Sequence, residues 1–301
     1  MNGPAATAQL LAEVFPHSHI ANVDYLRWLY EESPFGPVVE SNLDDDRGRV
    51  GHYALVPIAL ARDGVDYPAA LSLNTAVHER GRGGGVFVEL GERTVAKAAE
   101  MGLESVVGVA NANSTPGFVR RLGFELLTPL PARMVTPLPG TSAGIHSAEV
   151  RYGSGGWELG PEDDAVLSVP RRGEARRWTA QTLAWRLRRP RAGYAVHRGP
   201  GLLAFTCLER RAGLRIAVLL KVFAAAPLSG GECRALVRAA CRHHRAPFAL
   251  HAGLNDLVDF GGIAVPRRLR TSPLNLIYRS LVTPPREASI VRFEFLDFDA
   301  Y

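Results

Sequence analysis

The segment from Arg80 to Gly85 combines positive charge with an open backbone, and this combination is suited to binding a phosphate group. The guanidinium groups of Arg80 and Arg82 each carry a permanent positive charge. Glycines lack a Cβ atom, so their backbone can adopt positive φ and a ligand can approach their amides closely. The glycines of the segment are Gly81, Gly83, Gly84 and Gly85. These residue types predict a loop that binds an anion such as a diphosphate.

The segments on either side of this loop predict elements that would position it. Residues 71–77 (LSLNTAV) have the short apolar composition of a strand. Residues 86–101 predict a helix, because apolar residues recur at spacings of three and four before Gly102. The free N–H groups and the positive dipole end of such a helix favour an anion. A solvated surface loop is the competing interpretation, and the flanking strand and helix favour phosphate binding.

The spacing distinguishes several kinds of phosphate loop. A nucleoside-triphosphate P-loop is excluded because Val86 and Phe87, instead of Lys and Ser or Thr, follow Gly85. A dinucleotide fingerprint lacks its last glycine, since Val86 stands at that position. Glu104 lies at about the right distance for the ribose-binding acid of that fingerprint. The dinucleotide site therefore stays as a competing hypothesis.

The loop resembles the coenzyme A pyrophosphate loop of the GNAT family of N-acetyltransferases. That motif is Arg or Gln, two residues, Gly, one residue, then Gly or Ala, and residues 80–85 satisfy it. A second register, residues 82–87, places the following helix more naturally but puts Phe87 where Gly or Ala is usual. Both registers remain open at this point.

A second block supports the resemblance. The strand-like residues 104–109 lead into an asparagine-rich turn and then into Leu122-Gly123-Phe124. This order is similar to the last block of the family, in which an Asn after the fifth strand is followed by a short helix and Leu-Gly-Phe. The matching residue is Asn111 or Asn113. The resemblance covers residues 72–124.

The resemblance implies an α/β (α+β) fold with a mixed, largely antiparallel sheet flanked by helices. It also implies that acetyl-CoA or another acyl-CoA is the co-substrate and that no metal is used. Backbone amides of the family's fourth strand hold the pantetheine, and one of them faces the thioester carbonyl. The residues implied to bind the cofactor are Asn74, Thr75, Ala76, Val77, Arg80, Arg82, Gly83, Gly84, Gly85, Val86, Asn111 and Asn113.

Acyl transfer to an amine requires a free-base amine, a donor for the oxyanion and a proton for the departing thiolate. His52 is predicted as the base because its side chain titrates near neutral pH, and a structural histidine is the alternative. Its rivals as the base are Glu31, Glu32, Glu40 and His78. We carry His52, Ser114 and Glu31 forward as the predicted catalytic residues.

The general acid that would protonate the departing thiolate does not follow the family pattern. The family's usual acid is a Tyr in the helix before Leu-Gly-Phe, and this chain has Val119 there with Phe118 beside it. The Ser114 hydroxyl, water or the substrate amine could supply the proton instead. The missing Tyr also keeps a non-catalytic acyl-CoA binding module as an alternative.

The residues before the loop complete a domain. Helices are predicted over residues 7–14 and 23–32, and strands over residues 37–41, 50–61 and 67–77. The connectors are rich in Asp, Asn and Gly, which suit hairpin turns. The triple Asp at 44–46 is interpreted as such a turn, because the fixed-spacing Gly and Glu of a calcium loop do not follow it.

Composition limits the class of protein. A chain of 301 residues with 47% hydrophobic and 22% charged residues is expected to form one large or two ordinary globular domains. The sequence shows no apolar run long enough for a membrane span and no secretory signal, so we expect a cytoplasmic protein without a membrane partner. Three cysteines are too few for a disulfide framework, and Cys241 with His243 and His244 lacks zinc-site spacing. No metal site is therefore predicted.

The net charge of +5 comes mainly from arginine. Clusters near residues 171, 176, 186–191 and 267–270 could contact nucleic acid, but prolines interrupt them and no nucleic-acid motif accompanies them. Nucleic acid is therefore ranked last among the partners, and the anionic coenzyme A also fits a positive field. The excess of Arg, Ala and Gly over Lys and Ile indicates a GC-rich, bacterial genome.

The second half of the chain partly repeats the first. Leu183-Ala184-Trp185 echoes Leu26-Arg27-Trp28, and strands at 202–208, 214–223 and 248–252 with a helix at 231–244 repeat the element order. Residues 278–281 are predicted to end a short helix. Residues 224–231, at the place of the loop, contain no cation. We expect a catalytic domain over residues 1–135, a linker over 136–156 and a degenerate GNAT-like domain over 157–301 that shapes the acceptor side without binding cofactor.

The sequence as a whole predicts an acyl-CoA-dependent N-acyltransferase that acts on a small-molecule amine, such as an amino-sugar or a specialised metabolite, by direct attack. O-acylation is an alternative that the same loop would serve. A binding module for acyl-CoA or for an acyl carrier protein is the alternative outside enzymes. Oligomeric state is not predicted.

Overall fold

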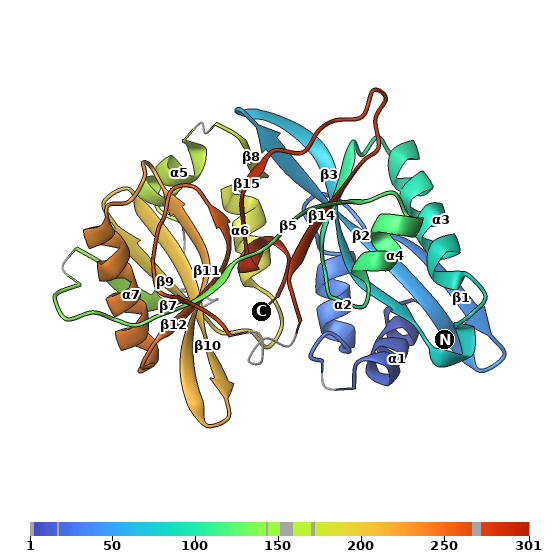
Figure 1. Ribbon diagram of the computed structural model, residues 1–301, viewed down its shortest axis with the longest axis horizontal. Helices are drawn as coiled ribbons and strands as arrows, with labels where there is room; N and C mark the ends of the chain where they lie inside the picture. The colour runs from blue at the N-terminus through green and yellow to red at the C-terminus, as the bar shows by residue number, and fades with distance from the viewer. Residues whose placement is uncertain are drawn as a thin grey trace. The chain divides into compact units, whose positions relative to one another are not determined.

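The computed structural model describes residues 3–16, 18–142, 144–150, 159–169, 172–266 and 272–300 (Figure 1). Contacts divide the chain into two compact units. The first unit comprises residues 1–61, 65–129 and 272–288, and the second comprises residues 62–64, 130–271 and 289–301. Each unit is described by itself below.

The first unit is a mixed sheet with helices. Its elements are α1 (Pro4–Val14), α2 (Val23–Tyr30), β1 (Val39–Asp45), β2 (Gly48–Arg62), β3 (Val65–Val77), α3 (Val86–Glu100), β4 (Ser105–Ala110), α4 (Thr115–Arg121), β5 (Glu125–Pro129) and β14 (Asn275–Ser280). The strand order is β5-β14-β4-β3-β2, with β1 paired to β2. β1 and β2 are antiparallel, β3 and β4 are parallel, and β14 is antiparallel to both β4 and β5.

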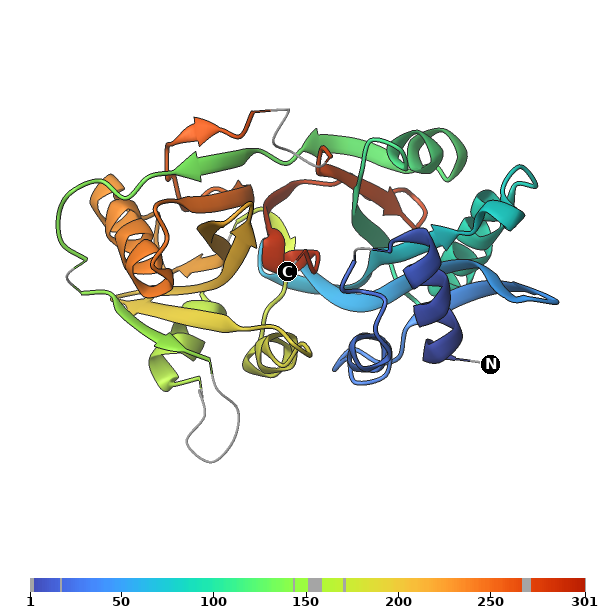
Figure 2. The same cartoon turned by 90° about the horizontal axis from the view of Figure 1, so that it is seen from below.

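Local sequence explains why the helices form where they do. Asn22 caps α2, because its side-chain oxygen accepts hydrogen bonds from the amides of Asp24 and Tyr25. Leu90 and Val95 of α3 recur on one face and are buried in the core of this unit. The helices α1 and α2, in dark blue, lie side by side (Figure 1 and Figure 2). Buried apolar side chains therefore hold α3 against the core of this unit and hold α1 against α2.

The second unit repeats much of this order. Its elements are β6 (Ala132–Val135), β7 (His146–Glu149), α5 (Pro161–Ser168), β8 (Glu174–Arg176), α6 (Ala180–Leu187), β9 (Tyr194–Gly199), β10 (Leu202–Arg211), β11 (Leu214–Ala224), α7 (Gly230–His244), β12 (Ala249–Asn255), β13 (Ile263–Ala264), β15 (Ile290–Glu294) and the short 3₁₀ helix η3 (Phe295–Asp297). The strand order is β8-β15-β12-β11-β10-β9-β7, and β6 pairs with β12 and β13. β11 and β12 are parallel, as β3 and β4 are in the first unit.

The two units alternate along the chain. The chain leaves β5 of the first unit and adds β6 to β12 of the second. Residues 272–288 then return to the first unit, where β14 pairs with both β4 and β5. The units are therefore discontinuous in sequence, and the division into residues 1–135, 136–156 and 157–301 stays a prediction of domain organisation.

The predicted fold class, a mixed and largely antiparallel sheet flanked by helices, is confirmed. The short helix predicted to end at residues 278–281 is wrong, because Tyr278 to Ser280 belong to strand β14. Leu276, Ile277 and Tyr278 are all buried, and a strand buried on both faces gives a continuous apolar run without alternation. The arginines at 267, 268 and 270 and at 171, and residues 151–156 of the predicted linker, lie outside the described residues.

Candidate active site

A cavity of about 240 Å³ lies in the first unit at the end of the β3–β4 pairing. The two strands pair from Ala69 to Ser72 opposite Ser105 to Gly108, and the residues beyond these pairs form two walls of the cavity. The lining residues are Phe15, Ile20, Ser72, Leu73, Asn74, Thr75, Val109, Ala110, Asn111, Ser114, Phe118, Ser272, Pro273, Leu274 and Ile277. The lining contains hydroxyl and amide groups among apolar side chains and could hold an uncharged, partly apolar group.

Asn74 has an unusual backbone conformation in the wall formed by β3. Its φ is 52°, in the left-handed region that residues other than glycine rarely adopt. Its side-chain amide donates a hydrogen bond of 3.0 Å to the hydroxyl of Tyr30. β3 therefore departs locally from regular extended geometry where it faces the cavity, so that backbone groups near Asn74 do not follow the regular alternation of a strand.

The glycine loop connects β3 with α3. After a 3₁₀ turn at Glu79–Gly81, Gly83 and Gly85 adopt φ values of 87° and 77°, and Gly85 is the N-cap of α3. A Cβ atom placed on Gly83, Gly84 or Gly85 would meet no atom within 4 Å. The loop backbone is open, and the first amides of α3 follow it directly. This is the arrangement that binds an anion at a helix N-terminus.

The two arginines of the loop have different surroundings. Arg80 forms an ion pair with Asp45 at 3.0 Å, and this hydrogen bond raises the pKa of Arg80 and lowers the pKa of Asp45. Arg82 is exposed, and its guanidinium has no ion-pair partner among the residues that the structure describes. Arg82 is therefore the cation of the loop that can contact a bound anion without first breaking an ion pair.

Asn111 and Ser114 form the turn that starts α4. The side-chain oxygen of Asn111 accepts hydrogen bonds of 2.9 Å from the amides of Asn113 and Ser114. The hydroxyl of Ser114 in turn accepts a hydrogen bond of 3.1 Å from the amide of Asn111. Asn111 and Ser114 line the cavity, whereas Asn113 is exposed and is not among the lining residues. The turn thus holds one hydroxyl at the cavity wall.

The surroundings of His52 match the structural-histidine alternative. Its side chain is fully buried, its Nδ1 lies 2.6 Å from the side-chain oxygen of Asn42, and its Nε2 lies 2.8 Å from the Tyr30 hydroxyl. Burial, and secondarily the charge of Arg49, lower the pKa of His52 to about 3. The imidazole is neutral at physiological pH, and both of its nitrogens are occupied.

Glu31 is the C-cap residue of α2, is exposed, and is not among the residues that line the cavity. Its role as a base stays a prediction. The rival His78 accepts a hydrogen bond from the amide of Arg80 and is likewise not a lining residue.

Sequence reasoning missed the contribution of the C-terminal segment to the site. Ser272, Pro273, Leu274 and Ile277 line the cavity, and the hydroxyl of Ser272 accepts a hydrogen bond of 2.9 Å from the amide of Ala112. The apolar run in β14 could have predicted a strand, but no local signal places a strand beside another one about 150 residues earlier in the chain. Tyr30, Phe15 and Ile20 were also missed, because no local signal shows that these residues lie near the cavity.

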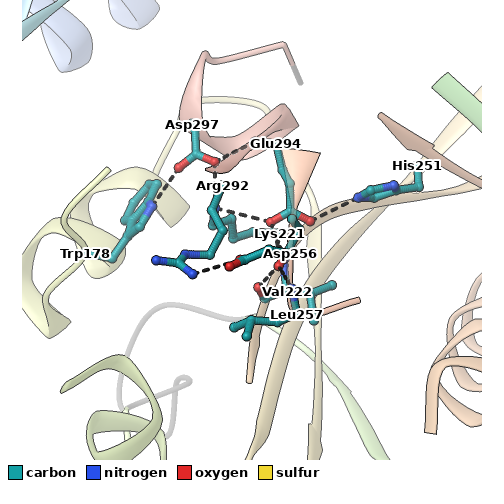
Figure 3. A network of polar contacts seen from close by, with 10 residues as sticks. Trp178, Lys221, Val222, His251, Asp256, Leu257, Arg292, Glu294 and Asp297 are labelled. Atoms are coloured by element: carbon teal, nitrogen blue, oxygen red, sulfur yellow. Dashed lines mark hydrogen bonds and ion pairs between the residues drawn. The ribbon is translucent and has the colours of Figure 1, made fainter. Parts of the chain in front are cut away.

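The corresponding place in the second unit is filled by a buried carboxylate. β11 pairs with β12 as far as Leu219 opposite His251, and beyond these pairs lies the side chain of Glu294 from β15 (Figure 3). Glu294 accepts hydrogen bonds from Asn255 at 3.0 Å and from the amide of Val222 at 3.4 Å. Its other partners are Lys221 at 3.2 Å and His251 at 3.1 Å.

The carboxylate of Glu294 is held in its charged form. Burial by itself would raise the pKa of Glu294, but Lys221 and His251 keep it below its usual value. Lys221 also pairs with Asp297 at 2.7 Å, and Asp297 accepts a hydrogen bond of 2.8 Å from the indole of Trp178 (Figure 3). A network of charges therefore occupies the place where the first unit has its cavity.

The described residues hold neither a candidate membrane span nor a candidate metal centre. Within the described ranges, no helix is both long and apolar enough to cross a membrane. In the same part of the chain, no group of three or more His, Cys, Asp or Glu side chains is arranged to hold a metal ion.

Comparison with known proteins gives a family match for the N-terminal part of the chain and similar folds among solved structures. Residues 5–127 match the family described as acetyltransferase (GNAT) domain. A search of curated proteins finds no match. Among solved structures, a GCN5-related N-acetyltransferase from Anabaena variabilis is similar with a TM-score of 0.66 and 13% identity, covering 92% of this chain and 70% of that chain.

Two other similar structures are Eis1 from Mycobacterium abscessus and the N-myristoyltransferase of Saccharomyces cerevisiae with bound myristoyl-CoA. Eis1 has a TM-score of 0.56 and 14% identity, with 91% of this chain and 70% of that chain covered. The myristoyltransferase has a TM-score of 0.54 and 12% identity, and the similarity covers 91% of this chain and 78% of that chain. At these identities the similarity shows the fold. The predicted resemblance to GNAT acetyltransferases is confirmed.

Proposed function

We propose that the chain, whose residues 5–127 match the acetyltransferase (GNAT) domain family, transfers an acyl group from coenzyme A to a small-molecule amine. One observation carries the proposal. The cavity wall at Ser72–Thr75 and the anion-binding loop at Gly83–Gly85 lie on one continuous segment, at and just after the end of β3. An acyl-CoA placed along this segment would put its thioester in the cavity and its diphosphate at the start of α3.

The loop geometry supports the second register of the pyrophosphate motif. Gly85 is the N-cap of α3, and Arg82 is the arginine without an ion-pair partner in the described part of the chain. We assign the diphosphate to Arg82, to the amides of Gly83–Gly85 and to the first turn of α3 from Val86. Arg80 contributes to the positive field while it remains paired with Asp45.

The pantetheine arm is assigned to the backbone from Asn74 to Val77. An acetyl group and a fatty-acyl group are both compatible with the partly apolar lining of the cavity. One structure of similar fold was solved with myristoyl-CoA bound. We propose acetyl-CoA as the first donor to test.

The chemistry assigned to the site is direct transfer. The nitrogen of a neutral amine attacks the thioester carbonyl, the C–S bond breaks as the tetrahedral intermediate collapses, and the proton lost by nitrogen goes to the thiolate. We assign the stabilisation of the oxyanion to a backbone amide near Asn74. We assign to Ser114, a lining residue, the hydrogen bond to the departing sulfur; its hydroxyl, which donates to Oδ1 of Asn111 at 3.2 Å, would turn toward the sulfur to make it.

The base is assigned differently from the sequence-based expectation. A neutral histidine whose nitrogens are both bonded cannot exchange a proton with substrate, so we give His52 a structural role. Among the described residues that line the cavity, none carries a carboxylate or an imidazole, so the amine is proposed to enter as the free base or to lose its proton to water. Glu31 remains a candidate for receiving that proton from water.

The second unit is proposed to shape the acceptor side and to bind no cofactor of its own. The support is the position of Glu294, which occupies the place of the cavity, together with the absence of a cation from residues 224–231. We place the protein in the cytoplasm, where acyl-CoA is available.

A turnover assay tests this function. Release of the free coenzyme A thiol from acetyl-CoA is measured with a panel of amino-sugars and other small amines, and with matching alcohols. Amine-dependent thiol release would support the proposal, and it should rise with pH as more of the amine becomes free base. Thiol release that occurs with alcohols and not with amines would favour O-acylation. The absence of thiol release with every acceptor in the panel would contradict the proposed reaction.

A further inference from the structure

A buried chain of hydrogen bonds connects the cavity wall with the interior of the first unit. The side-chain amide of Asn74 donates to the hydroxyl of Tyr30, at 3.0 Å. The oxygen of Tyr30 lies 2.8 Å from Nε2 of His52, and Nδ1 of His52 lies 2.6 Å from the side-chain oxygen of Asn42. Tyr30 and His52 are 3% and 0% exposed, so water does not compete for these groups.

The hydrogens of this chain can be assigned from its chemistry. The side-chain oxygen of Asn42 can only accept, so Nδ1 of His52 carries the proton and Nε2 accepts. The hydroxyl of Tyr30 therefore donates to His52, and its oxygen accepts from Asn74. Each hydrogen bond therefore has one direction, and the four side chains form a single chain from Asn42 to Asn74 that ends at the cavity.

The chain is uncharged over the physiological range. Burial raises the pKa of Tyr30 above its ordinary value and lowers the pKa of His52 to about 3. The charged groups facing the pair are Glu40, 3.5 Å from Nδ1 of His52, and Arg49. Both pKa directions keep the tyrosine and histidine neutral, so the direction of the hydrogen bonds persists.

The hydrogen-bond chain ends at a residue whose backbone lies in the left-handed region. Asn74 has a φ of 52° near the C-terminal end of β3, where this strand lines the cavity. For an L-residue this conformation is less favourable than the ordinary regions. A hydrogen bond to a buried, immobile hydroxyl holds the side chain and, with it, the turned backbone.

We propose that Tyr30 and His52 are positioning residues that hold Asn74 in its left-handed conformation and thereby shape the wall that receives the thioester end of acyl-CoA. This inference rests on the proposed function. Tyr30 and His52 are not among the lining residues, so they act through Asn74.

The first test compares substitutions of Asn74 itself. Gly adopts positive φ without strain, so N74G should keep the turned backbone without the anchor and change the Kd for acetyl-CoA by less than about threefold. Ala has a Cβ and no amide, so N74A should weaken binding by about tenfold. Equal Kd values for N74G and N74A would overturn the proposal.

The second test asks whether Tyr30 acts through Asn74. Y30F keeps the ring and removes the hydroxyl, so the Kd for acetyl-CoA should rise by about tenfold in the wild-type background. In the N74G background, Y30F should have no further effect, because the glycine needs no anchor. A merely structural role of Tyr30 would weaken binding equally in both backgrounds and would overturn the proposal.

Y53F is the matched control. Tyr53 is also buried, and its hydroxyl lies 3.0 Å from that of Ser72, a lining residue in the paired part of β3. It should change the Kd by less than about twofold in both backgrounds. Thermal unfolding of every variant separates loss of folding from loss of the site, and the Asn74 pair keeps the test decisive if Y30F does not fold.

The outcomes separate this proposal from the proposed function. If the folded wild-type protein binds neither acetyl-CoA nor a longer acyl-CoA, the proposed function fails and the inference fails with it. If the wild type binds and Y30F binds equally well, the inference alone fails.

Discussion

Arg80 and Arg82 are separated by one residue, but their guanidinium groups have different surroundings. The guanidinium of Arg80 pairs with Asp45, whereas the motif alone would assign that positive charge to the ligand. Sequence reasoning left the register of the loop open because a motif gives residue types and not partners. The structure supplies the partner, and the two arginines can be tested against each other.

Replacing Arg82 by Ala should weaken acetyl-CoA binding by about 1–2 kcal/mol, because a charge-assisted contact to the diphosphate is lost. Replacing Arg80 by Ala is the matched control and should change binding by less than about 0.5 kcal/mol. Calorimetric titration measures both, and the R82A difference should shrink at high salt. A larger effect of R80A than of R82A would support the first register instead.

The pKa of His52 predicts a pH dependence of stability. Its folded pKa of about 3 lies below the ordinary value of 6.5, so the unfolded chain binds a proton that the folded chain does not. The free energy of unfolding should therefore fall as the pH falls below 6.5, by up to about 1.4 kcal/mol per pH unit from this group, until about pH 3.

Urea unfolding at pH 7 and pH 5 checks this prediction. His197 and His244, whose pKa values burial lowers to about 3 and about 4, contribute in the same direction. The variant H52Q should therefore show a smaller loss of stability between the two pH values than the wild type does. An unchanged difference would mean that His52 is already protonated in the folded protein.

At the scale of the elements, the part of the site that follows local sequence was predictable. The strand, loop and helix around residues 71–101 follow from composition, glycine placement and helical periodicity, and the structure contains all three. The Asn111 turn and α4 follow for the same reason. The insertion of β14 could not be predicted, because strand pairing over about 150 residues depends on tertiary packing and leaves no local pattern.

The glycines of the loop differ in what they require. Gly85 has a φ of 77° at the N-cap of α3, whereas Gly84 has no positive φ, and a Cβ atom on either residue would meet no atom within 4 Å. G85A should cost about 1 kcal/mol of stability and weaken acetyl-CoA binding, because the strained residue turns the amides away. G84A is the control and should leave thermal stability within about 0.5 kcal/mol. Equal effects of the two would contradict the assigned conformation.

At the scale of the whole molecule, the same element order has two outcomes. The place after the parallel strand pair is a cavity in the first unit and a charge network around Glu294 in the second. The sequence indicated the difference through the missing cation at residues 224–231, but Glu294 lies 72 residues after Val222 of β11 and 39 residues after Asn255 of β12. A buried carboxylate that accepts from a strand amide leaves that amide no bond for a ligand.

Replacing Glu294 by Ala should destabilise the protein by about 3 kcal/mol, because Lys221 would keep Asp297 as its one buried acidic partner and the buried groups of Val222 and His251 would lose their acceptor. D256N is the matched control, since Asp256 pairs with Arg292 at 2.8 Å but is 47% exposed, and it should cost less than about 1 kcal/mol. Urea unfolding measures both. Equal costs would show that the network contributes no more than a surface pair.

The central claim is that the chain holds one acyl-CoA, in the first unit. Calorimetric titration of the wild-type protein with acetyl-CoA tests it most directly. We predict saturable binding at micromolar or tighter affinity with one molecule bound per chain. The absence of binding by any acyl-CoA, or a stoichiometry of two, would contradict the claim.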